Sequence, residues 1–106
     1  MDLDKKIILE HTKNLMTSKD YKDRMVAEYQ QLLVRTQSLK KIIAEYHKDS
    51  LGFKTTCPIH LLEMQLLRMI EYLNILDMRA EIEEIELYDL WKGDKQYDYK
   101  STIKSY

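Results

Sequence analysis

The chain has 106 residues, and its 17 basic and 18 acidic side chains give a formal net charge of −1. This length leaves room for one domain. The near-neutral charge argues against a dedicated duplex-DNA binder, which needs a basic surface, so nucleic acid is an unlikely partner. Two glycines and one proline are too few for a turn-rich β-sandwich or a glycine-rich nucleotide loop. We therefore expect an all-α fold.

The cellular compartment is indicated by the single cysteine and by the N-terminal sequence. Cys57 has no partner for an intramolecular disulfide, which fits a reducing cytosol. The segment MDLDKKIILEHTKN has an apolar run of three residues, too short for a signal peptide or a membrane span. We predict a cytoplasmic protein that does not insert into membranes.

Charge is distributed unevenly along the chain. Residues 1–57 carry nine Lys, two Arg and eight acids, which gives +3, whereas residues 58–91 carry two Arg and eight acids, which gives −6. A basic first half and an acidic second half can attract each other in an antiparallel hairpin or between subunits. Two solvated helix faces that merely differ in charge would give the same pattern.

Two helices are predicted in the first half of the chain. Residues 3–17 allow a short amphipathic N-terminal helix that could cap a bundle or reach a neighbouring subunit. A longer helix over residues 20–48 follows Ser18 or Asp20, either of which can cap its N-terminus. Its mainly apolar stripe alternates at spacings of four and three, the heptad pattern of packed helices: Met25, Tyr29, Leu32, Thr36, Leu39, Ile43 and Tyr46.

A third helix is predicted over residues 58–91. Gly52 breaks the preceding pattern, Phe53 is expected to close the end of the hairpin, and Pro58 suits the first turn of a helix. One face of this helix keeps the heptad spacing through Ile59, Leu62, Leu66, Met69, Leu73, Leu76 and Ala80. A further apolar row comprises Met64, Ile70, Ile75, Met78, Ile82 and Ile85.

These two apolar rows predict self-association. One neighbouring helix cannot cover both rows, and soluble monomers rarely leave so large an apolar surface in water. We expect residues 1–91 to form a single domain, a long antiparallel helical hairpin with a short N-terminal helix, that oligomerises into a helical bundle as a dimer or a larger homo-oligomer. Residues 92–106 come after the last predicted helix and lack its periodicity, so we expect them to form a Tyr- and Lys-rich tail.

Catalytic and metal-binding patterns are missing from the sequence. It has no GxSxG, HExxH, P-loop or Rossmann glycine pattern. His11, His47 and His60 lie in three separate segments, and none has a partner at a convincing ligand spacing. We predict a protein that is not an enzyme and that holds no metal and no cofactor.

A polar row beside the core positions of the third helix is the candidate binding site. Gln65, Tyr72 and Arg79 are seven residues apart, and Arg68 precedes Tyr72 by four. Arg24 occupies a comparable flanking position on the preceding helix. Guanidinium groups can grip phosphates, and a tyrosine ring can stack on a base. The row could therefore hold a nucleotide, although Arg–Glu pairs that set helix register produce the same spacing.

Three stretches between residues 21 and 87 carry a resemblance to a known family: YKDRMVAEYQQLLVRTQSLKKII, GFKT and LLEMQLLRMIEYLNILDMRAEI. They resemble a family of small helical-hairpin proteins of tailed bacteriophages and prophages, first labelled from crAss-like phage. The resemblance covers about two thirds of the chain and implies a phage or prophage origin, and hence the cytosol of a bacterial host. The segments before Tyr21 and after Trp91 lie outside it.

Phage origin and small helical size suggest a function by analogy. Several compact phage proteins are counter-defence sponges that trap the nucleotide second messengers of bacterial immunity. By this analogy we expect an anti-defence protein that sequesters a cyclic nucleotide-type signal, such as a cyclic ADP-ribose isomer or a cyclic oligonucleotide, without cleaving it. The alternative is a non-catalytic coiled-coil module that binds a host or phage protein.

Overall fold

The computed structural model describes residues 2–87, apart from the side chains of residues 2–5 and 7. Within this part of the chain the regular elements are three helices with no strand: α1 (Asp2–Met16), α2 (Tyr21–His47) and α3 (Ile59–Glu83). The all-α expectation is therefore confirmed for the described residues. The predicted tail, residues 92–106, lies outside them.

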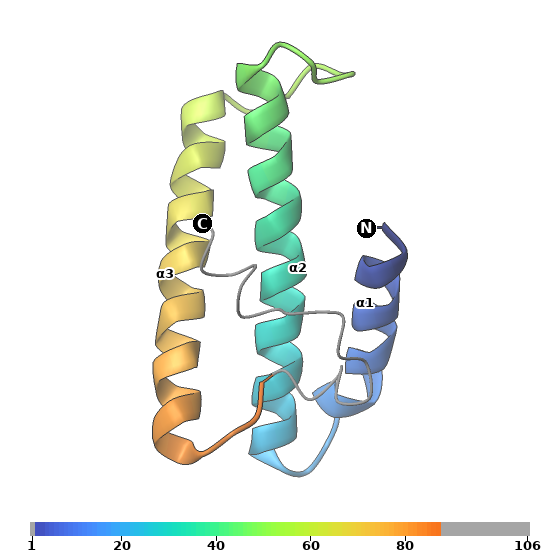
Figure 1. Ribbon diagram of the computed structural model, residues 1–106, viewed down its shortest axis with the longest axis vertical. Coiled ribbons are helices and arrows are strands. Elements are labelled where there is room, and N and C mark those ends of the chain that lie inside the picture. Colours follow the sequence, from blue (N-terminus) through green and yellow to red (C-terminus); the bar gives the residue numbers. More distant parts are fainter. Residues whose placement is uncertain (1, 88–106) are drawn as a thin grey trace.

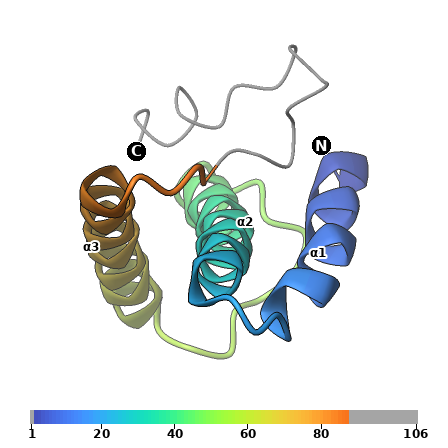
Figure 2. The same ribbon diagram turned by 90° about the horizontal axis from the view of Figure 1, so that it is seen from below.

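The three helices form one layer with α2 in the middle. In Figures 1 and 2, α1 lies against one side of α2 and α3 against the other. α2 and α3 run side by side in opposite directions (Figure 1). Within the described part of the chain, α3 therefore contacts α2 through one face, and its opposite face is turned away from the layer.

Local sequence signals set the ends of α2. Asp20 is the N-cap, and its Oδ1 accepts a hydrogen bond of 2.9 Å from the backbone N–H of Lys22. At the other end Asp49 adopts a left-handed conformation with φ 58°. The backbone N–H of Ser50 then bonds to the carbonyl of Glu45 at 2.9 Å, which completes a Schellman-type stop.

α3 is shorter than the sequence predicted. The heptad pattern indicated a helix over residues 58–91, but the helix ends at Glu83. Glu84 is left-handed, with φ 56° and ψ 46°, and the N–H of Ile85 returns to the carbonyl of Ala80 at 2.9 Å. Acidic side chains at this helix end oppose the macrodipole, which favours a stop there. Residues 88–91 lie outside the described part.

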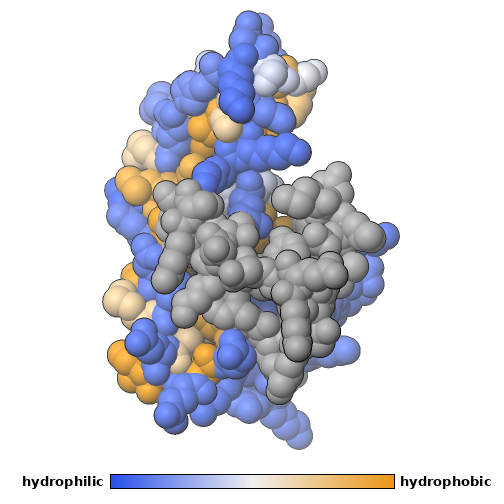
Figure 3. Space-filling model, viewed as in Figure 1, coloured by the Kyte–Doolittle hydropathy of each residue, from blue (hydrophilic) through white to orange (hydrophobic). Residues whose placement is uncertain are grey.

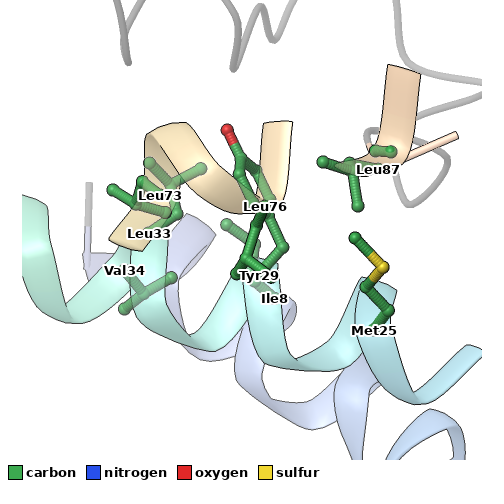
Figure 4. Close-up of a cluster of buried hydrophobic side chains, with 9 residues drawn as sticks. Ile8, Met25, Tyr29, Leu33, Val34, Leu73, Leu76 and Leu87 are labelled. Carbon is green, nitrogen blue, oxygen red and sulfur yellow. The ribbon is translucent and has the colours of Figure 1, made fainter. Parts of the chain in front are cut away.

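The core is assembled on α2 by side chains from both neighbouring helices and from the segment that follows α3. Tyr29 and Leu73 are 0% exposed, and Leu33 and Leu76 are 1% exposed. Figure 4 shows these side chains together with others from α1, α2 and the turn after α3. The buried apolar cluster comprises Ile8, Met25, Tyr29, Leu33, Val34, Leu73, Leu76, Ala80 and Leu87.

Two sequence expectations concern residues outside this core. Phe53 does not close the end of the helix pair, because its side chain is 59% exposed. The second apolar row of α3 is largely exposed to solvent, including Ile75, Met78 and Ile82. Among the described helices, none is long and apolar enough to cross a membrane.

Candidate functional site

The predicted polar row lies along the exposed surface of α3. Gln65, Tyr72 and Arg79 are all exposed, and the Tyr72 side chain keeps 42% of its area accessible. A rise of 1.5 Å per residue separates Tyr72 from Arg79 by about 10 Å along the helix axis. Arg68 lies about 6 Å from Tyr72 by the same measure. A single small ligand can therefore contact Tyr72 together with either Arg68 or Arg79.

Both arginines of the row are paired with glutamates of their own helix. Arg68 Nη1 lies 2.9 Å from Glu71 Oε1, and Arg79 Nη2 lies 3.3 Å from Glu83 Oε2. The arginine side chains are 66% and 50% exposed. Exposed ion pairs of this kind contribute about 0–1 kcal/mol. An anionic ligand can therefore replace the carboxylate as the partner of either guanidinium at little cost.

A tyrosine that the sequence analysis did not single out joins the Arg79 end of the row. The hydroxyl of Tyr21, in the first turn of α2, donates a hydrogen bond of 2.6 Å to Glu83 Oε1. This bond, together with the charge of Glu83, raises the pKa of Tyr21. The same bond from Tyr21, with a smaller effect from Arg79, lowers the pKa of Glu83. Tyr21, Glu83 and Arg79 thus tie the start of α2 to the end of α3.

Arg24 is held by a different part of the chain. Its Nη1 donates a hydrogen bond of 2.6 Å to the carbonyl of Ser18, in the linker between α1 and α2. The other four predicted site residues share α3, whereas Arg24 is anchored toward α1. The structure therefore brings together Gln65, Arg68, Tyr72 and Arg79 as one surface.

A hollow of about 690 Å³ lies at the end of the helix pair where α2 is joined to α3, opposite the end that holds Arg79 and Tyr21. It is lined by residues 53–59 together with Tyr46, Asp49 and Leu51. Its volume is typical of small-molecule sites, and Lys54 provides a positive charge. None of the five predicted site residues lines it. The shape of the hollow depends on the conformation of the loop between α2 and α3. Helical periodicity in the sequence could not predict this conformation.

The histidines have the surroundings of surface groups. His47 Nε2, at the end of α2, lies 2.8 Å from Glu63 Oε2 on α3, and both side chains are about half exposed. Among the side chains that the structure describes, no group of three or more His, Cys, Asp or Glu residues could hold a metal ion.

Comparison with known proteins gives one result. A family model described as Sequestin matches residues 19–82, which include all five predicted site residues. The match begins just before α2 and ends within the last turn of α3. No curated protein and no solved structure matches the chain.

Proposed function

Because the chain belongs to the Sequestin family, we propose that it is a phage anti-defence protein that binds a nucleotide-type immune signal and sequesters it without cleaving it. The family name is consistent with sequestering a small signalling molecule, a binding role rather than catalysis. The nucleotide nature of the signal, the phage setting and the cytosol of the bacterial host belong to the proposal.

One observation carries the proposal: the matched region presents an exposed tyrosine between two exposed arginines on a single helix. Tyr72 offers a flat ring for stacking a base, and Arg68 and Arg79 offer planar donors for phosphate oxygens. Gln65 carries an amide that can read the edge of a base. A sequestering protein needs affinity alone, and this set supplies it without a nucleophile or a metal.

The proposal also includes self-association. A lone α3 surface is open, and an open surface removes little of a ligand from water, whereas most small-molecule sites are concave. We propose that the chain forms a long antiparallel hairpin that oligomerises into a helical bundle, so that ligand is held where copies meet. Arg24 is part of the proposed set as a phosphate donor from α2.

The test is calorimetry of the full chain with a panel of cyclic dinucleotides, cyclic trinucleotides and cyclic ADP-ribose isomers. We expect one member of the panel to bind, and we expect the ligand to be recovered unchanged by chromatography after the complex is heat-denatured. Absence of binding by every member would overturn the proposal. Recovery of a cleaved product would show that the protein is an enzyme instead.

Matched arginine variants locate the site. Arg79→Ala should weaken ligand binding at least about tenfold, since charge-assisted hydrogen bonds to one guanidinium contribute about 1.5–3 kcal/mol. Arg35→Ala removes an exposed arginine of α2 outside the row and should leave binding unchanged. If Arg79→Ala changes the oligomer mass instead of the affinity, the arginine sets helix register and the row is not a ligand site.

The alternative function, a module that binds a host or phage protein, makes the opposite prediction about the row. The exposed apolar residues of α3 are the observation that favours it. Under this alternative no nucleotide binds, and Tyr72→Ala has no effect in the calorimetric panel. Stacking of one base on an aromatic ring contributes about 1–3 kcal/mol, so the two functions differ measurably at this residue.

A further inference from the structure

The face of α3 that points away from α2 carries a seam of exposed apolar side chains with a charged pair at its centre. Several of its members are half exposed or more, with Met64 at 52%, Ile75 at 50%, Met78 at 58% and Ile82 at 81%. Figure 3 shows hydrophobic residues along the α3 side of the molecule. Since α2 packs on the opposite face of α3, through Leu73, Leu76 and Ala80, nothing in the described layer covers this seam.

The residues of the seam follow heptad spacing, as in helices that pack along their whole length. Steps of three and four residues connect successive members. We call this set the outer seam: Leu61, Met64, Arg68, Glu71, Ile75, Met78 and Ile82.

The outer seam is complementary to itself when one copy is reversed. Its members from Leu61 to Met78 are arranged symmetrically about the bond between Met69 and Ile70. When two α3 helices lie antiparallel about that point, each residue of one copy meets the symmetry-related residue of the other. The apolar layers are then Leu61 against Met78 and Met64 against Ile75, each formed twice.

The charged residues of the seam obey the same symmetry. Arg68 and Glu71 are equidistant from the centre, so Arg68 of each copy meets Glu71 of the other. A parallel arrangement would instead place Arg68 against Arg68 and Glu71 against Glu71. A polar layer within an apolar seam fixes the register and the direction of helix pairing, because any other alignment leaves these charges against apolar side chains or like charges.

We propose that the outer seam is the contact between two copies of this chain, which pair through antiparallel α3 helices about a two-fold axis between Met69 and Ile70. This inference deepens the proposed function, since it rests on the self-association included there and adds the face, the direction and the register. A two-fold contact uses the same surface on both copies, as the symmetric seam requires.

The pairing also creates a shared ligand surface, on which Arg79 stays available to phosphate whereas Arg68 is engaged by Glu71 of the other copy. One edge of the outer seam is flanked by Gln65, Tyr72 and Arg79. In an antiparallel pair of helices, this edge of one copy lies next to the same edge of the other copy. A two-fold axis perpendicular to both helices keeps these edges on one side of the dimer. In this register Gln65 of one copy lies within one helical turn of Tyr72 of the other, Arg79 lies beyond Gln65 toward the outer end of the row, and each copy contributes to one surface.

Two charge-reversal variants test the register in ligand-free protein. Arg68→Glu places four acidic groups at the centre of its own dimer, and Glu71→Arg places four basic groups there. Each variant alone should dissociate at least about tenfold more readily than the unaltered chain, which corresponds to 1.4 kcal/mol. An equimolar mixture of the two restores opposite charges in every central pair and should dimerise like the unaltered chain. Light scattering and native mass spectrometry measure these masses.

Matched control variants on α2 distinguish an effect of the α3 pairing register from an effect of net charge. Lys41→Glu and Glu28→Arg change exposed residues of α2 by the same charges, and both variants should remain dimers alone and together. Ile75→Asp, which puts a carboxylate against the Met64 of the other copy, should give a folded monomer by circular dichroism. The proposal is overturned if the unaltered chain is a monomer, or if the mixture of Arg68→Glu and Glu71→Arg associates no better than either alone.

These measurements do not involve a nucleotide, so they are independent of the ligand panel. A dimer with the expected register that binds no nucleotide refutes the proposed function and leaves the interface standing. A monomer that binds nucleotide refutes the interface and leaves the function standing.

Discussion

Glu83 is a residue whose charge state links two helices. Its carboxylate accepts a hydrogen bond of 2.6 Å from Tyr21, and Arg79 lies at 3.3 Å. These partners favour the ionised form and lower the pKa of Glu83 below its ordinary value of 4.5. The stabilising contribution is therefore complete above pH 4.5 and is lost as the pH falls through the lowered pKa. Tyr21, whose pKa is raised, contributes below pH 10 and loses its contribution as the pH rises through the raised pKa.

We expect Glu83→Gln to reduce the dependence of the free energy of unfolding on pH in the acidic range. Urea unfolding between about pH 6 and pH 3 should show a smaller loss of the free energy of unfolding for this variant than for the unaltered chain. Glu28→Gln, which removes an exposed carboxylate of α2, is the control and should keep the original slope. Equal slopes for all three proteins would contradict this role of Glu83.

Leu73 shows how much one buried side chain contributes. It is 0% exposed in the apolar cluster between α2 and α3, so Leu73→Ala should lower the free energy of unfolding by about 2–5 kcal/mol. Leu67→Ala makes the same change on the same helix at a side chain that is 50% exposed, and should cost less than about 1 kcal/mol. Urea unfolding at one fixed protein concentration compares them, and similar losses would contradict the observed packing.

At the scale of the element, both long helices end at a residue with a left-handed backbone that is not glycine. Asp49 ends α2 with φ 58° and Glu84 ends α3 with φ 56°. A side chain in this conformation costs roughly 1–2 kcal/mol. Gly52, the glycine of the loop between these helices, does not occupy either position. Neither stop therefore has glycine, the residue that adopts this conformation most readily.

We expect Glu84→Gly to raise the free energy of unfolding by about 1 kcal/mol, because glycine adopts a positive φ without strain. Lys48→Gly, at a helix end with an ordinary φ of −86°, should be neutral or destabilising, since glycine gains conformational freedom in the unfolded chain. The thermal unfolding midpoint should thus rise for Glu84→Gly and should not rise for Lys48→Gly. A loss of stability in Glu84→Gly would contradict the left-handed stop.

The end of α3 explains why its length was wrong in the sequence analysis. Apolar spacing resumes at Leu87, which suggested one uninterrupted helix. In the structure Leu87 is 2% exposed, and its carbonyl accepts a hydrogen bond of 3.0 Å from Gln30 Nε2 on α2. The chain turns at Glu84 so that Leu87 covers the core. Periodicity cannot distinguish an apolar residue that continues a helix from one that packs after a turn.

At the scale of the whole molecule, one layer of three helices leaves α3 at an edge. A dimer through the outer seam would couple folding to association, because the folded state is then favoured by mass action. We expect the unfolding midpoint in urea to rise with protein concentration. Each tenfold increase in protein concentration should raise the apparent free energy of unfolding by about 1.4 kcal/mol. For Ile75→Asp the midpoint should not depend on concentration. A constant midpoint for the unaltered chain would contradict a dimer in this range.

The sequence by itself determined which segments are helical and which faces of them are apolar. Asp20 was one of two predicted N-caps and is the one observed, and the spacing of Leu73, Leu76 and Ala80 identified the face that is buried on α2. The same spacing identified Gln65, Tyr72 and Arg79 as neighbours on one row. These features depend on residues within one or two helical turns of each other, and the geometry of a single helix fixes them.

Only the tertiary structure decided how distant segments meet. It placed α1 and α3 on opposite sides of α2, exposed Phe53, anchored Arg24 toward α1 and brought Tyr21 to Glu83. Such contacts depend on the direction in which each loop returns the chain and on which buried side chains fit together. The free energy that selects them comes from packing over the whole core, so no local pattern in the sequence reports it.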